Sequence, residues 1–198
     1  MSSLDDVVEQ LSSDREERNK WIGVYIGVLA VLLAICSVGG GNATKDSIRA
    51  NIEASNTWAF FQAKNARRTA IQLAANELEL SLAAQPGLAA DVRKQFEERA
   101  KDYRAQVQLL TTDPMRKEGL DELFGKAKAL EIERDVALRK DPYFDWSQAM
   151  LQIGIVLASV HLIIGNMTLL GLSGALSLLG VLLMLNGFTL AVYLPFFG

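Results

Sequence analysis

Residues 147–194, SQAMLQIGIVLASVHLIIGNMTLLGLSGALSLLGVLLMLNGFTLAVYL, determine the architecture of this chain. Two apolar segments, about 147–165 and about 169–194, are separated only by the residues Asn-Met-Thr, and neither contains Asp, Glu, Lys or Arg. As a helix, each segment is long enough to cross the roughly 30 Å hydrocarbon core of a bilayer. Because three residues allow only a tight reversal, the stretch predicts an antiparallel pair of transmembrane helices.

A third stretch without these charged residues lies near the start of the chain, WIGVYIGVLAVLLAICSVGGG at residues 21–41. Its apolar part has about 18 residues, close to the lower limit for a membrane-spanning helix. A cleavable signal peptide is the alternative, but a polar tail of residues 1–20 precedes the stretch, and Gly-Gly-Gly is a poor cleavage site. We therefore expect a first transmembrane helix at 21–41, and three in all.

The segment between the first and second spans, residues 42–146, carries most of the charged residues. Gly39–Gly41 would let the backbone turn as it leaves the bilayer, and Thr44 could then cap a new helix. No Pro or Gly follows until Pro86-Gly87, so one helix of about 42 residues, roughly 63 Å long, is predicted. Small residues recur along it at spacings of three and four: Ala63, Ala66, Ala70 and Ala74.

Two shorter helices are expected to return toward the membrane. The first covers about 88–110, and the second begins after Thr112-Asp113-Pro114, a capping signal, and runs over about 114–140 until Asp141-Pro142 ends it. Their combined length, roughly 75 Å, nearly matches that of the outgoing helix. Residues 42–146 therefore predict a helical hairpin outside the membrane, coiled-coil-like in its apolar spacing, which we call the stalk.

The composition supports this fold class and excludes several others. Half of the residues are hydrophobic (50%) and 22% are charged, and none of the charged residues lies within 21–41 or 149–198. Apolar stretches of this length without a charged residue exclude a purely soluble enzyme. A single Cys excludes a disulfide-stapled secreted module, and a net charge of −3 excludes a nucleic-acid binder with a basic face. The expected class is an all-α membrane protein with three transmembrane helices and the stalk between the first and second.

The sequence contains no recognisable catalytic or metal-binding motif. With one His, neither a zinc-binding histidine cluster nor a His-Glu-x-x-His motif can form. Cys36 lies in an apolar span, where a thiol packs as a small apolar side chain. Glu131, Glu133 and Asp135 could attract a cation, but a solvated helix face is the simpler interpretation. We expect no catalytic, cofactor-binding or metal-binding residues, no cofactor and no enzymatic activity.

Four polar residues in the second and third spans are candidate intramembrane contacts: Gln148, Gln152, His161 and Asn186. Antiparallel pairing of the two helices places Asn186 level with Gln148 and one turn from Gln152. An unpaired amide in lipid costs several kcal/mol, so Asn186 should find one of these glutamines or another subunit. The simplest interpretation is a polar clasp that holds the hairpin together, and the alternative is a proton or ion path.

Several stretches resemble a bacterial membrane-protein family known only as domain of unknown function 4337. They are Asn51–Ala70 (NIEASNTWAFFQAKNARRTA), Ala127–Trp146 (AKALEIERDVALRKDPYFDW), Met150–Val160 (MLQIGIVLASV) and Gly180–Leu190 (GVLLMLNGFTL). The resemblance extends over nearly the whole chain and implies a bacterial inner-membrane protein with the same layout. It brings no catalytic residues.

The segment that carries the most distinctive part of this resemblance also contains a candidate interaction surface. Its residues are Glu53, Asn56, Trp58 and Phe61. Trp58 and Phe61 share one helix face, as do Glu53 and Asn56. The aromatic pair could pack on the returning helices near Ala127–Leu138. Alternatively, the aromatic and amide surface could meet a neighbouring subunit or a partner protein.

These features predict a structural or interaction protein that self-associates or docks a membrane-protein partner through its stalk. The alternative is a subunit of an oligomeric channel or transporter-like assembly, and no nucleic-acid partner is expected. The expected location is the bacterial inner membrane, with several passes through the lipid bilayer. Basic residues near the spans slightly favour a cytoplasmic stalk, although Arg18 and Lys20 beside the first span argue for the opposite orientation.

Overall fold

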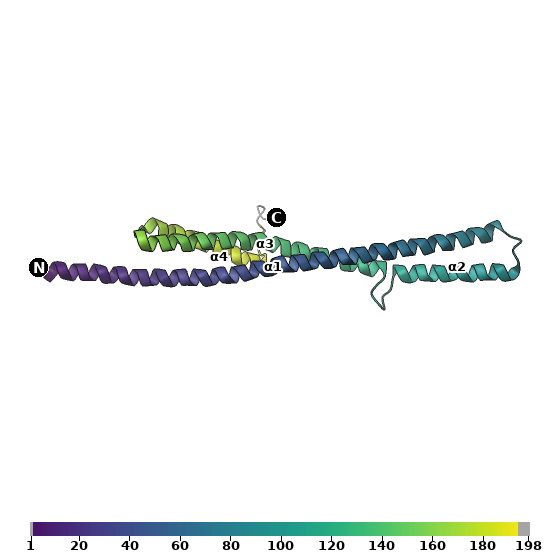
Figure 1. Ribbon diagram of the computed structural model, residues 1–198, viewed down its shortest axis with the longest axis horizontal. Helices are drawn as coiled ribbons and strands as arrows, with labels where there is room; N and C mark the ends of the chain where they lie inside the picture. The colour runs from purple at the N-terminus through teal and green to yellow at the C-terminus, as the bar shows by residue number, and fades with distance from the viewer. Residues whose placement is uncertain (1, 194–198) are drawn as a thin grey trace. The chain divides into compact units, whose positions relative to one another are not determined.

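The computed structural model describes the backbone of residues 2–193 and the side chains of residues 16–193. Within this range the chain forms four α-helices and no strand (Figure 1). The helices are α1 (Ser2–Ala84), α2 (Ala90–Thr111), α3 (Leu120–Ile164) and α4 (Met167–Thr189). Three of them, α1, α3 and α4, are long and apolar enough to cross a membrane. The all-helical prediction and the number of candidate spans are confirmed, and the expected end of the third span at residue 194 lies outside the described residues.

The expected turn at Gly39–Gly41 is wrong, because α1 continues through these glycines as a single helix. Gly39 and Gly40 are buried, and a Cβ atom on Gly39 would lie 2.6 Å from Cε1 of Phe144. Close approach of α3 thus offsets the helix-propensity cost of glycine, which is about 1 kcal/mol per residue. Thr44 does not cap a new helix, since its hydroxyl donates to the carbonyl of Gly40 and to Asp141.

The expected bounds of the last returning helix are also wrong. α3 begins at Leu120, after a turn in which Lys117 has a positive φ of 55° and the backbone N–H of Arg116 bonds the Asp113 carboxylate. α3 then continues through Pro142 to its end in the second apolar segment. A proline inside a helix costs about 3 kcal/mol. Phe144, two residues after the proline, is only 1% exposed, and burial of this large ring offsets part of that cost.

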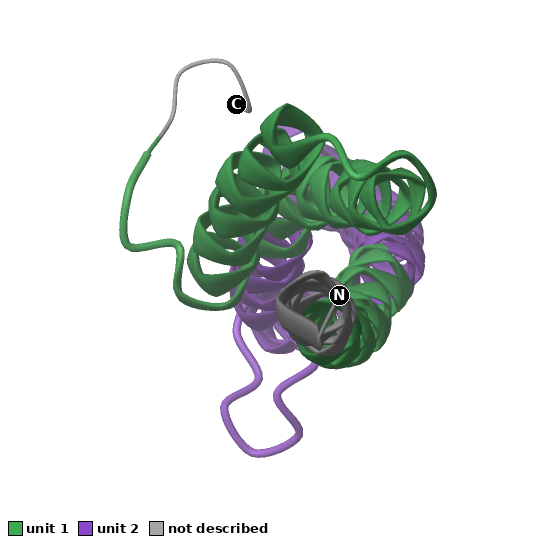
Figure 2. Cartoon of the chain, turned by 90° about the vertical axis from the view of Figure 1, so that its left-hand side faces the viewer, with its two compact units in different colours: residues 1–47, 135–198 green, residues 48–134 purple. Residues whose placement is uncertain are grey.

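The chain divides into two compact units, and both divisions fall inside helices (Figure 2). Unit 1 comprises residues 1–47 and 135–198, and unit 2 comprises residues 48–134. The core of unit 1 joins residues of α1, α3 and α4: Leu29, Cys36, Ala43, Phe144, Leu151 and Met184. On α1 the buried positions recur every seven residues, so one narrow face of the helix packs on the other two.

Unit 2 consists of the last part of α1, all of α2 and the first part of α3. Arg104 of α2 bonds Glu79 of α1, whereas Trp58 of α1 bonds Glu131 of α3. Arg104 precedes Glu131 in the chain, whereas its partner Glu79 follows Trp58. The helices α2 and α3 therefore run antiparallel to α1. Figure 1 shows α2 alongside the final turns of α1. The turn at Gln85–Ala89 that joins them contains the predicted break, Pro86-Gly87.

The ion pair between Glu79 and Arg104 predicts a pH dependence for unit 2. Two hydrogen bonds from Arg104, at 2.9 and 2.6 Å, lower the pKa of the Glu79 carboxylate. A carboxylate whose pKa is lower in the folded than in the unfolded chain stabilises the fold at pH values above its usual, unfolded-state pKa. This contribution is lost as the pH falls through the lowered pKa of the folded chain. We expect Glu79→Gln to lower the melting temperature of the protein slightly near pH 7, because exposed pairs contribute little.

The expected difference between wild type and Glu79→Gln disappears at a pH below the lowered pKa, where both side chains are uncharged. Thermal unfolding followed by circular dichroism at a series of pH values measures it. Glu77→Gln is the control, since it removes the same charge two positions earlier on α1. An effect of Glu79→Gln that persists unchanged at low pH contradicts the prediction.

Candidate interaction site

Three aromatic rings from α1 and α3 form a cluster in unit 2. Trp58 lies edge-on to Phe61 and to Phe124, with ring centroids 5.5 Å apart in both pairs. Phe61 and Phe124 complete the triangle at 6.4 Å. Such edge-to-face pairs add about 0.5–1.5 kcal/mol beyond the area that they bury. Phe124 is not among the residues that the sequence predicted for this surface.

The indole of Trp58 is also held by a polar contact at the edge of the cluster. Its Nε1–H donates to Glu131 Oε1 at 2.9 Å, and Lys128 donates to the other carboxylate oxygen at 2.8 Å. The Lys128 ammonium also lies 5.6 Å from the centroid of the indole. These hydrogen bonds, from Lys128 first and Trp58 second, lower the pKa of Glu131. The structure thus packs Trp58 against α3 within its own chain.

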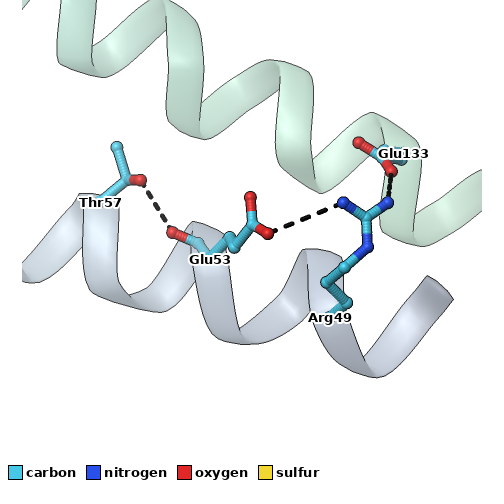
Figure 3. Close-up of polar contacts among 4 residues, drawn as sticks. All are labelled: Arg49, Glu53, Thr57 and Glu133. Carbon is cyan, nitrogen blue, oxygen red and sulfur yellow. Dashed lines mark hydrogen bonds and ion pairs between the residues drawn. The ribbon is translucent and has the colours of Figure 1, made fainter. Parts of the chain in front are cut away.

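Glu53 and Asn56 do not join the aromatic cluster. Glu53 is exposed and lies 3.7 Å from Arg49, which also pairs with Glu133 of α3 at 2.5 Å (Figure 3). The Glu53 carbonyl accepts a hydrogen bond from the Thr57 hydroxyl one turn later. Asn56 is exposed. The four residues that we expected on one surface are therefore divided, with the two aromatics turned toward α3 and the two polar residues exposed.

A second apolar feature of unit 2 was not expected from the sequence. Phe60, Leu109 and Met115 line an open groove of about 660 Å³ between α1 and the end of α2, and they are 47%, 63% and 92% exposed. Lys64 and Arg67 lie along the same groove. Amphipathic spacing alone does not predict this groove, because the turn after α2 brings Met115 close to α1 only in the folded chain.

Asn186 in unit 1 has a different partner from the expected glutamines. Its amide donates to the carbonyl of Val192 at 2.8 Å, and its side-chain oxygen accepts from the N–H of Val192 at 2.9 Å. The intervening Leu190 has a left-handed φ of 49° and caps α4. Tyr143 of α3 also donates to the Val192 carbonyl, at 3.3 Å. Asn186 thus ties down the chain that follows α4, and does not join α4 to α3 directly.

The other three polar candidates have separate environments in unit 1. His161 is 1% exposed, and its Nδ1 lies 2.7 Å from the carbonyl of Asn166, so it secures the connection between α3 and α4. Gln148 is half-buried beside Gly40, and Gln152 is exposed. The structure does not gather these residues into one polar cluster.

A group of hydroxyls joins α1, α3 and α4, and the sequence analysis did not find it. The Tyr25 hydroxyl donates to Ser177 at 3.0 Å and lies 3.1 Å from the Ser173 hydroxyl. Ser173 donates to the carbonyl of Gly154, and Ser147 donates to that of Gly180. Serines spaced four residues apart in an apolar helix were the available signal. Each hydroxyl satisfies its hydrogen bond on a facing helix, which suits an apolar surrounding.

Among the residues whose side chains are described, no group of three His, Cys, Asp or Glu residues could hold a metal ion. Most of the polar contacts described above join helices to one another or to their connections, and the others lie within one helix. What the arrangement offers chemically is a set of exposed apolar and amide side chains on unit 2.

Comparison with known proteins identifies a family for this chain. A family model described as "Domain of unknown function (DUF4337)" matches residues 18–190, which confirms the resemblance seen in the sequence. No curated protein and no solved structure matches the chain.

Proposed function

The chain belongs to the DUF4337 family, and from that premise we propose that it is a membrane-anchored interaction protein of the bacterial inner membrane. Its three apolar helices cross the bilayer, and unit 2, which makes up most of the stalk, stands outside the membrane. The stalk self-associates or docks a partner membrane protein. The proposal assigns the chain no enzymatic activity, no cofactor and no nucleic-acid partner.

The charge distribution supports a stalk in water. Asp, Glu, Lys and Arg are absent from residues 21–41 and 149–198, whereas unit 2 carries them on all three of its helical segments. Charged side chains at the centre of a bilayer are costly, so a helical unit this rich in them belongs outside the hydrocarbon. The antiparallel contacts of α2 and α3 with α1 supply the two arms of the hairpin.

The observation that carries the proposal is the exposure of large apolar side chains on this charged unit. Phe60, Leu73, Leu80, Leu109 and Met115 are between 47% and 92% exposed. In unit 1 such exposure is expected because lipid covers the surface. Phe60, Leu109 and Met115 line one groove, and in a unit surrounded by water such a group of apolar side chains marks an interaction surface.

The proposal is tested by the mass of the purified protein in a mild detergent. One chain has a mass of 21.7 kDa. We expect light scattering, corrected for bound detergent, to give a multiple of this mass or a stoichiometric complex with a second membrane protein. A single-chain particle with nothing bound, both in detergent and in lipid nanodiscs, contradicts the proposal.

A subunit of an oligomeric channel or transporter-like assembly is the second candidate. It is favoured by Gln152, whose polar side chain is exposed on an apolar part of α3. His161 and Asn186 bond backbone groups of their own chain, which suits a structural role better than a pore lining. We therefore place the interaction protein first.

A further inference from the structure

The part of α1 in unit 2 has two faces with a seven-residue repeat, and only one of them is covered within the chain. Ala50, Ala54 and Thr57 belong to the buried face. A second set of apolar residues lies two positions away from these, on the opposite side of the helix. This outer seam consists of Ile52, Ala59, Ala66, Leu73 and Leu80, all of them exposed.

The spacing of the outer seam is that of a helix that pairs lengthwise with another helix. Its five members follow one another at intervals of seven residues without exception. Over a straight helix such a repeat drifts around the surface, but it stays in one line when two helices supercoil. The seam from Ile52 to Leu80 is about 42 Å long. Exposed fractions of 55% at Ile52, 58% at Leu73 and 69% at Leu80 leave it open to a partner.

The charges of α1 favour a second copy of this chain as that partner. Between residues 51 and 76, the positions that flank the outer seam are uncharged: Ser55, Asn56, Gln62, Ala63, Thr69, Ala70 and Asn76. The charged positions that flank the seam lie toward its ends, at Arg49 beside Ile52 and at Glu77 between Leu73 and Leu80. The charged residues of the same segment, Glu53, Lys64, Arg67 and Arg68, fall outside this arc. In a symmetric pair each residue on the seam faces its own copy, so a charged seam would repel itself, whereas a neutral one does not.

The flanking amides suit the same occupant. An amide both donates and accepts hydrogen bonds, so Asn56 at one edge of the seam can bond a polar side chain at the facing edge of a second copy. Two copies in one membrane have the same orientation, so their α1 helices run parallel. Ala59 and Ala66, with Ala63 and Ala70 beside them, allow the two backbones to approach closely.

We propose that the outer seam of α1 pairs in parallel and in register with the same seam of a second copy of this chain. The inference rests on the proposed function and makes it specific, since it names the surface and its occupant. The aromatic cluster around Trp58 stays inside each chain, where it packs α1 against α3.

Cysteine crosslinking in membranes tests the pairing. Ala66→Cys and Leu73→Cys each place a thiol on the outer seam, opposite its own copy, where a disulfide can form only at close range. Gln72→Cys is the matched control, because residue 72 is exposed and adjacent in sequence but turned about 100° away. The wild type, whose single Cys36 is buried, gives the background. After mild oxidation we expect most of each seam variant, and little of either control, to shift to the mass of two chains.

A second variant pair tests the same seam without a cysteine. Ala66→Arg places two like charges against each other in the pair and is expected to lower the particle mass in detergent, whereas Gln72→Arg leaves it unchanged. Both residues are exposed, so the helicity of the chain should be retained in each variant.

The outcomes separate this inference from the proposed function. Equal crosslinking at residues 66, 72 and 73, or none at the seam in a protein of multiple mass, overturns the pairing and leaves the interaction protein standing. A crosslink from the seam to a different protein also overturns the second copy as occupant. A single-chain particle without any crosslink overturns both.

Discussion

Truncating Trp58 to Ala is expected to destabilise unit 2 by about 3 kcal/mol, near the lower end for loss of a tryptophan because the ring is half-buried. The substitution removes two edge-to-face contacts, with Phe61 and Phe124, and the hydrogen bond to Glu131. Denaturant unfolding of the full chain, followed by circular dichroism, measures the loss. The fraction of helix should fall in two stages as unit 2 unfolds before unit 1.

Trp58→Phe is the matched control for this prediction. It keeps an aromatic ring against Phe61 and Phe124 but loses the Nε1–H donor, so we expect a smaller loss of stability than in Trp58→Ala. If Trp58→Ala instead preserves stability and abolishes the multiple mass in detergent, the ring acts between chains and the packing account is wrong.

Replacing Gly39 with Leu is expected to disrupt the packing of α1 on α3 and α4 in unit 1. Even a Cβ atom at this position would lie 2.6 and 2.9 Å from ring atoms of Phe144 and 2.9 Å from Phe188. The two rings pack edge to face at 4.9 Å, so neither can move without losing that contact. Overpacking of this kind costs about 1–3 kcal/mol and can cost more. A lowered melting temperature in detergent measures it.

Gly41→Leu is the control for Gly39→Leu, because a Cβ atom on Gly41 would meet nothing within 4 Å. Leu has a higher helix propensity than Gly, so this variant should be neutral or more stable by up to about 1 kcal/mol. Equal effects at the two positions would mean that α1 does not pack on α3 through Gly39.

The sequence by itself determined the features that depend on composition along the chain. Three charge-free segments predicted three apolar helices, and the short connection before α4 predicted its reversal. Pro86-Gly87 marked the end of α1, and the helix expected at about 88–110 is α2 at Ala90–Thr111. These signals are local, because a charge in lipid or a proline in a helix costs free energy whatever surrounds it.

Only the tertiary structure decided at which positions packing outweighs a local helix-breaking residue. Gly39–Gly41 and Pro142 are helix breakers by propensity, yet α1 and α3 continue through them. The packing around Phe144 offsets the cost, and an unbroken helix also satisfies its own backbone hydrogen bonds beside an apolar segment.

The candidate site divides in the same way. A helix face could be read from the spacing of Trp58 and Phe61, but the choice of Phe124 and Glu131 as their partners depends on how α3 packs against α1. Asn186 needed a partner on chemical grounds, and the chain after α4 supplies it through Val192. Spacing assigns a residue to a face of its helix, whereas the partner of that face depends on contacts between residues far apart in sequence.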